Sequence, residues 1–129
     1  IKATKTWAAD LDQADENYEH HLLEALWMHQ TMHAVDTDLL GQVLAAKDHR
    51  ARAAATRVLS FWINDVPNSM ELLEKCVNDS HPRVRLEAVR ALSFAAGDDA
   101  IELALAVLEH DMDDYLQYTL DETMRQLEQ

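Results

Sequence analysis

The chain has 129 residues, and its 24 acidic side chains against 11 basic ones give a formal net charge of −13. It contains two glycines, two prolines and one cysteine, while Ala, Leu and Glu are abundant, so its composition favours helix almost throughout. A single cysteine excludes an internal disulfide, and no apolar run approaches the ~20 residues that a membrane-spanning helix needs. Length and composition together predict one all-α domain over residues 1–129.

The first predicted unit, or cap, occupies residues 1–35. Four side chains near its start recur at the spacing of one helix face: Trp7, Leu11, Ala14 and Tyr18. Residues 20–33 are expected to form the second helix of this unit.

Three further units are predicted, over residues 36–65, 66–97 and 98–129. Asp36 is a plausible N-cap for the second unit, whose helices are separated by a turn at Lys47 and Asp48. Pro67 suits the first helical position of the third unit. Gly97 is the expected stop at the end of that unit.

The central units repeat with a period of 33 residues. Sliding residues 39–65 onto residues 72–98 gives ten identities in 27 positions, including the pairs Leu59/Leu92 and Arg57/Arg90. A fixed period of this size is typical of a stacked helical solenoid. We therefore expect a right-handed α-α superhelix of about three and a half antiparallel helix pairs.

The repeat decays in the last unit. Leu116 stands where the earlier units have Arg52 and Arg85, and Thr123 stands where they have leucine. Terminal repeats are usually atypical because one face meets water or another domain.

Charge is unevenly distributed along the chain. Residues 1–46 carry a net −6, residues 47–90 a net +2, and residues 91–129 a net −9. Acidic ends make a poor face for phosphates, so nucleic acid is not an expected partner. Two interpretations of this charge remain open. The net charge serves only solubility, or the positive middle section binds an acidic partner.

The string NDSHPRVRLEAVRAL at residues 78–92 resembles the consensus of HEAT-like repeats. This resemblance extends over about residues 20–127 and implies that Asp79 and Arg85 bond along the stack, with Arg52 in the equivalent place of the preceding unit. Ala46 replaces the aspartate there, so the expected ladder is incomplete.

A narrower resemblance is to the helical-repeat segment of large planctomycete- and verrucomicrobia-type bacterial proteins, which join a dehydrogenase-like propeller to a c-type cytochrome domain. Residues 20–30, 47–61 and 113–127 carry this likeness. It implies a periplasmic or otherwise exported redox protein in which the present stretch connects other domains. Because no Cys-x-x-Cys-His motif occurs, no cofactor is expected in this chain.

Histidines are the main candidates for chemistry. His29 and His33 share one helix face, but no further ligand has zinc-site spacing, so a solvated or capping pair is favoured over a metal site. His20 and His21 are interpreted as polar residues of a turn rather than as a general base. No catalytic constellation is evident, and the predicted module is not an enzyme.

Two arginine pairs should align when the units stack. Arg52 and Arg85 are predicted to bond turn carbonyls and carboxylates between repeats. Arg57 and Arg90, with nearby Trp62, are predicted to form an exposed ridge that binds a partner. For Trp62 itself, and for Trp27, burial between repeats is the favoured interpretation and an exposed anchor the alternative.

The sequence therefore predicts a non-catalytic HEAT-like interaction or spacer module of a larger bacterial redox protein. The expected partners are other domains of the parent chain or an acidic protein segment, with no membrane contact. The alternatives are a small HEAT-like enzyme, of bilin lyase or DNA glycosylase type, and a metal-binding domain.

Overall fold

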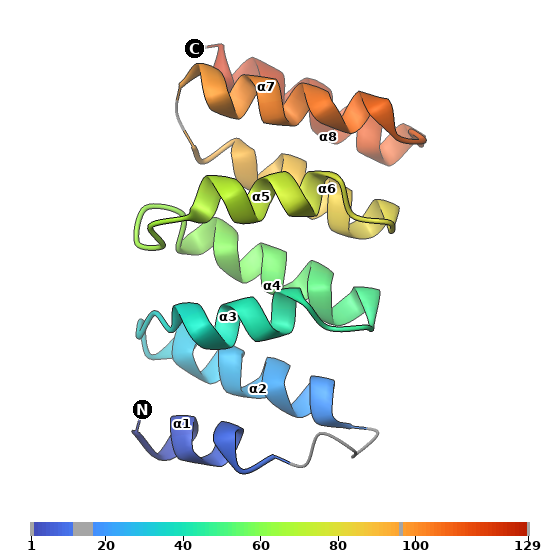
Figure 1. Cartoon of the computed structure of the whole chain (residues 1–129). Helices are drawn as coiled ribbons and strands as arrows, with labels where there is room; N and C mark the ends of the chain where they lie inside the picture. The colour runs from blue at the N-terminus through green and yellow to red at the C-terminus, as the bar shows by residue number, and fades with distance from the viewer. Residues whose placement is uncertain (1, 12–16, 96, 129) are drawn as a thin grey trace.

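A computed structural model describes residues 2–11, 17–95 and 97–128 of the protein. In these ranges the chain forms eight α-helices, one short 3₁₀ helix and no strand. Successive helices run in alternate directions and build pairs that stack in chain order, with the N-terminus at one end of the stack and the C-terminus at the other (Figure 1). The predicted all-α superhelix is confirmed.

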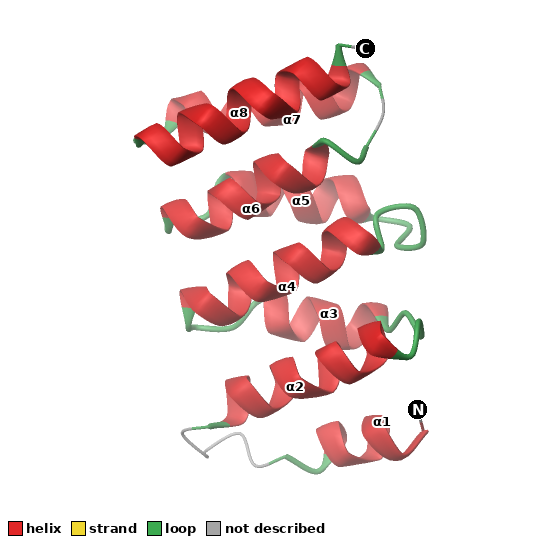
Figure 2. Ribbon diagram, turned by 180° about the vertical axis from the view of Figure 1, so that it is seen from behind, coloured by secondary structure: helices red, strands yellow, loops and turns green. Residues whose placement is uncertain are grey.

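The helices form two layers. Figure 2 shows the second helix of each pair in front of the first helices. The elements are α1 (Lys2–Ala9), α2 (Tyr18–Thr31), α3 (Thr37–Leu44), α4 (His49–Phe61), α5 (Ser69–Val77), α6 (Pro82–Leu92), α7 (Asp98–Ala106), the 3₁₀ helix η1 (Val107–Glu109) and α8 (Asp114–Leu127). Each second helix packs on the first helix of its own pair and on the second helices of adjacent pairs.

The core runs continuously through the stack between the two layers. Leu59 and Leu92 are both fully buried at equivalent places in α4 and α6, as the repeat predicts. Ala55 and Ala88, also fully buried, are small enough to let these two helices approach closely. Apolar area that one pair cannot cover alone is thereby removed from water by its neighbour.

Cys76 in α5 lies in this core with 6% of its surface exposed. The Thr56 hydroxyl approaches its sulfur at 3.5 Å while donating to the Arg52 carbonyl at 2.8 Å. Burial raises the pKa of the Cys76 thiol. The residue acts as a small apolar group, as predicted from its place in the repeat.

Most helix starts follow the sequence signals. An Asp36 carboxylate oxygen accepts from the Leu39 amide at 3.1 Å, which confirms the predicted N-cap. Asp48 and Asp113 cap α4 and α8 in the same manner. At α6 the cap is His81, and Pro82 takes the first helical position.

Two boundaries in the third unit differ from the predictions. Pro67 lies in a turn closed by the Ser69 amide on the Val66 carbonyl, so α5 begins two residues later than expected. Gly97 does not stop a helix; α6 has ended at Leu92, and the φ of 99° at Gly97 leads into α7.

The predicted helical face from Trp7 to Tyr18 is not one helix. The first helix, α1, ends at Ala9, and Tyr18 begins α2. Ala14, which was placed on that face, lies outside the described residues.

Leu92→Ala tests the packing between pairs. It should lower the free energy of unfolding by about 2 to 5 kcal/mol, because transfer energy is lost and a cavity remains. Chemical denaturation measures this cost. The control is Leu105→Ala on α7, where 42% of the side chain is exposed and a change within about 0.5 kcal/mol is expected. Equal costs for the two variants would contradict the stacking described here.

Candidate interaction surface

The outer side of α2, α4, α6 and α8, which we call the second-helix face, is hollowed by two grooves. The α2/α4/α6 groove has a volume of about 570 Å³ and is lined by Trp27, Arg57 and Phe61 among others. The α6/α8 groove, of about 530 Å³, is lined by Arg90, Phe94 and other side chains. Other hollows on the described part of the chain are smaller, such as one of about 340 Å³ beside His33 and Trp62.

Each groove contains the same arginine and phenylalanine, one repeat apart. Phe61 and Phe94 have 60% and 57% of their surface exposed, and Arg57 and Arg90 are also exposed. The spacing of four residues places Arg57 and Phe61 on one side of α4, whereas Phe94 follows Arg90 by four residues in the turn after α6. The second-helix face therefore presents a cation beside an aromatic ring twice, in successive units.

Arg57 and Arg90 differ from the other cations of this face in their pairing. Arg50 binds the Asp48 carboxylate at 3.1 Å, and Arg83 lies 3.4 Å from buried Glu87. Within the described ranges, neither Arg57 nor Arg90 has a carboxylate in ion-pair contact. Their charges remain available to a partner.

Burial is the favoured prediction for both Trp27 and Trp62, and the structure bears it out for Trp62 alone. Trp62, predicted as part of the exposed ridge, is 4% exposed and packs into the core directly after α4, so it cannot anchor a partner. Trp27, for which burial was favoured, is 42% exposed and lines the α2/α4/α6 groove. A turn after Phe61 directs Trp62 inward, whereas Trp27 stays on the outer side of a continuing helix.

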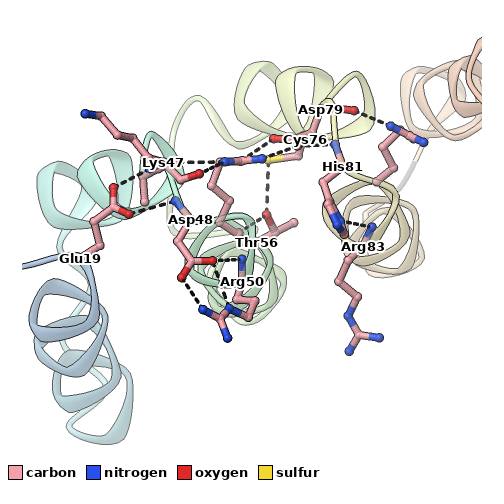
Figure 3. Close-up of polar contacts among 12 residues, drawn as sticks. Glu19, Lys47, Asp48, Arg50, Thr56, Cys76, Asp79, His81 and Arg83 are labelled. Atoms are coloured by element: carbon pink, nitrogen blue, oxygen red, sulfur yellow. Dashed lines mark hydrogen bonds and ion pairs between the residues drawn. The ribbon is translucent and has the colours of Figure 1, made fainter. Parts of the chain in front are cut away.

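The turns between the paired helices are joined along one edge of the stack (Figure 3). Arg52 in α4 donates to both carboxylate oxygens of Asp79, at 2.9 and 3.0 Å. The same guanidinium donates to the carbonyls of Ala46 and Lys47 at 3.0 and 2.9 Å. Four hydrogen bonds thus connect α4, its own preceding turn and the turn of the next unit.

Arg85 occupies the equivalent place in α6 but has different partners. It donates to the Asp79 carbonyl at 2.7 Å and to the Asp111 carbonyl of the following turn at 3.4 Å. The side chain of Asp79 is engaged by Arg52 of the preceding unit rather than by Arg85. Arg52, Arg85 and Asp79 therefore all bond between units. The resemblance to HEAT-like repeats pairs Asp79 with Arg85, but the Asp79 carboxylate binds Arg52 of the preceding unit.

Other contacts extend this column of turns. The Glu19 carboxylate at the start of α2 accepts from the amides of Lys47 and Asp48. Further along, Asn78 Oδ1 lies 2.9 Å from His110 Nε2. Each boundary between adjacent pairs therefore carries a polar connection at the same edge.

The sequence predicts a solvated or capping pair at His29 and His33, and His29 is not solvated. Its ring is fully buried, with Nδ1 3.0 Å from the Ala34 carbonyl and Nε2 3.9 Å from the Asp36 carboxylate. His33 is exposed and has a positive φ of 54°. Among the residues the structure describes, no group of three or more His, Cys, Asp or Glu side chains is arranged to hold a metal.

His49 and His81 stack at the starts of α4 and α6. Their rings are 3.6 Å apart and 9° from parallel. Partial burial, and after it the charge of His49, lowers the pKa of His81. The guanidinium groups of Arg52 and Arg85 act in the same direction, and Asp79 opposes them.

Comparison with known families identifies the family to which the chain belongs. Residues 37–125 match the family described as HEAT repeats, so the chain belongs to the HEAT-repeat family. The match begins at α3, and the pair α1/α2 continues the same stacking before it. No curated protein and no solved structure is significantly similar to the chain. No helix in the described part of the chain is long and apolar enough to cross a bilayer.

Sequence reasoning found the two exposed arginines but missed the aromatic part of the surface. The repeated triplet Leu-Ser-Phe could have predicted the exposed rings. At helical spacing, a phenylalanine two positions after a buried leucine lies on the side away from the core. The hydroxyls of Ser60 and Ser93 donate to the carbonyls of Arg57 and Arg90 at 2.5 and 2.6 Å, so both units share this contact although α4 ends at Phe61 and α6 already at Leu92.

Arg52→Met tests the column of turns. We expect the free energy of unfolding to fall by about 2 to 3 kcal/mol, because four hydrogen bonds are lost and a part-buried carboxylate is left unpaired. Arg50→Met is the matched control: the Arg50 side chain is 81% exposed, against 16% for Arg52, and its loss should cost less. A double-mutant cycle with Asp79→Asn would isolate the pair, and zero coupling would contradict the assignment.

His81→Asn tests the stacked histidines. The folded state lowers the pKa of His81 below its usual 6.5, so the unfolded chain binds more protons and this site destabilises the fold as pH falls from about 7 to 5. Asparagine removes the titration but keeps an acceptor for the Arg83 amide. Urea titrations should show the variant gaining stability relative to the wild type across that range. A difference independent of pH would refute the prediction.

Proposed function

We propose that this protein is a non-catalytic interaction module whose second-helix face binds an acidic protein segment. HEAT repeats commonly mediate protein interactions. The observation that carries the proposal is the pair formed by Arg57 and Arg90, exposed, without carboxylate partners among the described residues, and each beside an exposed phenylalanine. Arginine and aromatic side chains dominate the energetics of protein interfaces.

Charge supports an acidic partner. The middle of the chain is net positive, while residues 1–46 and 91–129 are strongly acidic. A basic partner would be attracted to the acidic ends of the stack rather than to its centre, and a nucleic acid would be repelled by those ends. A short acidic segment can contact the central cations without extending over the ends. Complementary charge of this kind mainly sets the rate of encounter and the specificity.

We further propose that the acidic segment lies in a neighbouring domain of a larger, exported bacterial redox protein. The support is the resemblance of residues 20–30, 47–61 and 113–127 to the helical segment of such proteins. In that arrangement the repeats hold other domains in place, and those domains supply the cofactors.

Charge reversal at the two arginines tests the binding proposal. Arg57→Glu/Arg90→Glu should weaken binding of a fluorescein-labelled flexible peptide rich in Asp, Glu and Phe by about tenfold at low salt, because two attractive contacts become repulsive. Fluorescence anisotropy measures the affinity, and circular dichroism verifies the fold.

The matched control is Lys47→Glu/Lys75→Glu, which makes the same change in net charge at exposed positions outside both second-helix grooves. This variant should retain most of the binding. Equal loss in both double variants would mean that net charge alone is responsible, and equal binding by all three proteins would refute the proposed surface.

A further inference from the structure

The repeat fixes the distance between the two cations of the second-helix face. Arg57 and Arg90 hold the same position on α4 and α6, which pack directly against each other. Packed helix axes lie about 8 to 10 Å apart. Equivalent backbone positions on the two helices are therefore offset by about that distance, along the direction of the stack.

The backbone conformation of a bound segment sets the distance between its side chains on one side, and this distance has to match the spacing of Arg57 and Arg90. A polyproline II helix has three residues per turn and a rise of 3.1 Å, so every third side chain returns to one side after about 9.3 Å. In a β-strand, side chains on one face recur every two residues, after about 6.6 Å, which is shorter than the offset between α4 and α6. Four residues span about 13 Å, which is longer than that offset.

An α-helical ligand is less suited to this surface. Its side chains at i and i+7 are about 10.5 Å apart, but the helix is about 10 to 12 Å across. Phe61 and Phe94 are 60% and 57% exposed, one at each groove, and a helix laid along the stack would have to pass over both rings.

The aromatic lining favours the extended form independently of the spacing. Trp27 and Phe61 line the α2/α4/α6 groove, and Phe94 and Tyr118 line the α6/α8 groove. All four rings are exposed, by between 42% and 66%. Proline-rich segments in polyproline II form bind in grooves lined by aromatic side chains.

We infer that the partner is a proline-rich acidic segment in polyproline II form, with acidic residues three positions apart. It lies across α4 and α6, one carboxylate on Arg57 and the next on Arg90, with the residues on either side of this pair against the rings of the two grooves. This inference rests on the proposed function and adds the conformation and the spacing of the ligand.

Short peptides that differ only in spacing test the inference. Each is a proline-rich dodecapeptide with two Asp residues, placed two, three, four or five positions apart, and binding is followed by NMR chemical-shift titration of the whole chain. The peptide with a spacing of three should bind about two- to fivefold more tightly than the others, because it alone makes both ion pairs.

Single variants complete the design. Arg57→Glu or Arg90→Glu should abolish the preference for a spacing of three, whereas Lys75→Glu, on the other layer, should leave it unchanged. The shifted amides should lie in α4 and α6. An acidic helical peptide with its carboxylates seven positions apart is the competing ligand, and tighter binding of that peptide would overturn the inference.

The outcomes separate this inference from the proposed function. Equal binding at every spacing, still dependent on both arginines, would overturn the polyproline II register and leave the acidic-segment surface intact. Binding of the flexible acidic peptide but of none of the proline-rich ones would do the same. Absence of arginine-dependent binding by either kind of peptide would overturn both.

Discussion

Every helix pair in this protein has an apolar side that only the next pair can cover, and the whole structure depends on that constraint. The packing of α4 on α6 shows it most clearly, since Leu59, Leu92 and small alanines between them are removed from water at this contact. Burial of this kind is the dominant favourable term in folding but has little directionality. Stacking alone therefore does not fix how one unit is rotated on another.

Polar contacts at the edge of the stack supply the missing direction. A guanidinium that donates two parallel bonds to a carboxylate and two more to carbonyls tolerates little rotation, and Arg52 does this across a unit boundary. Arg57 follows five residues later on the same helix, about 140° around its axis. Holding Arg52 against the turns of the stack thus helps direct Arg57 to the opposite, open side.

The same repeat therefore performs two tasks on two sides of one helix layer. On the turn side, Arg52 and Arg85 are engaged by groups of the protein itself. On the open side, Arg57 and Arg90 are exposed, have no carboxylate in ion-pair contact among the described residues, and lie near exposed aromatic rings. Stacked repeats place equivalent side chains at regular intervals, and regular intervals favour a ligand whose own conformation is regular.

The sequence by itself determined the local and repeating features: the all-α class, the Asp36 cap, the buried leucines and the alignment of the two arginine pairs. These depend on residues close in the chain or related by the period. Only the tertiary structure decided that Arg52 takes the carboxylate of Asp79, because that residue lies 27 positions away in the next unit. It also decided that Trp27 is exposed although burial is the favoured prediction, because the side of α2 that is covered depends on how the pairs stack.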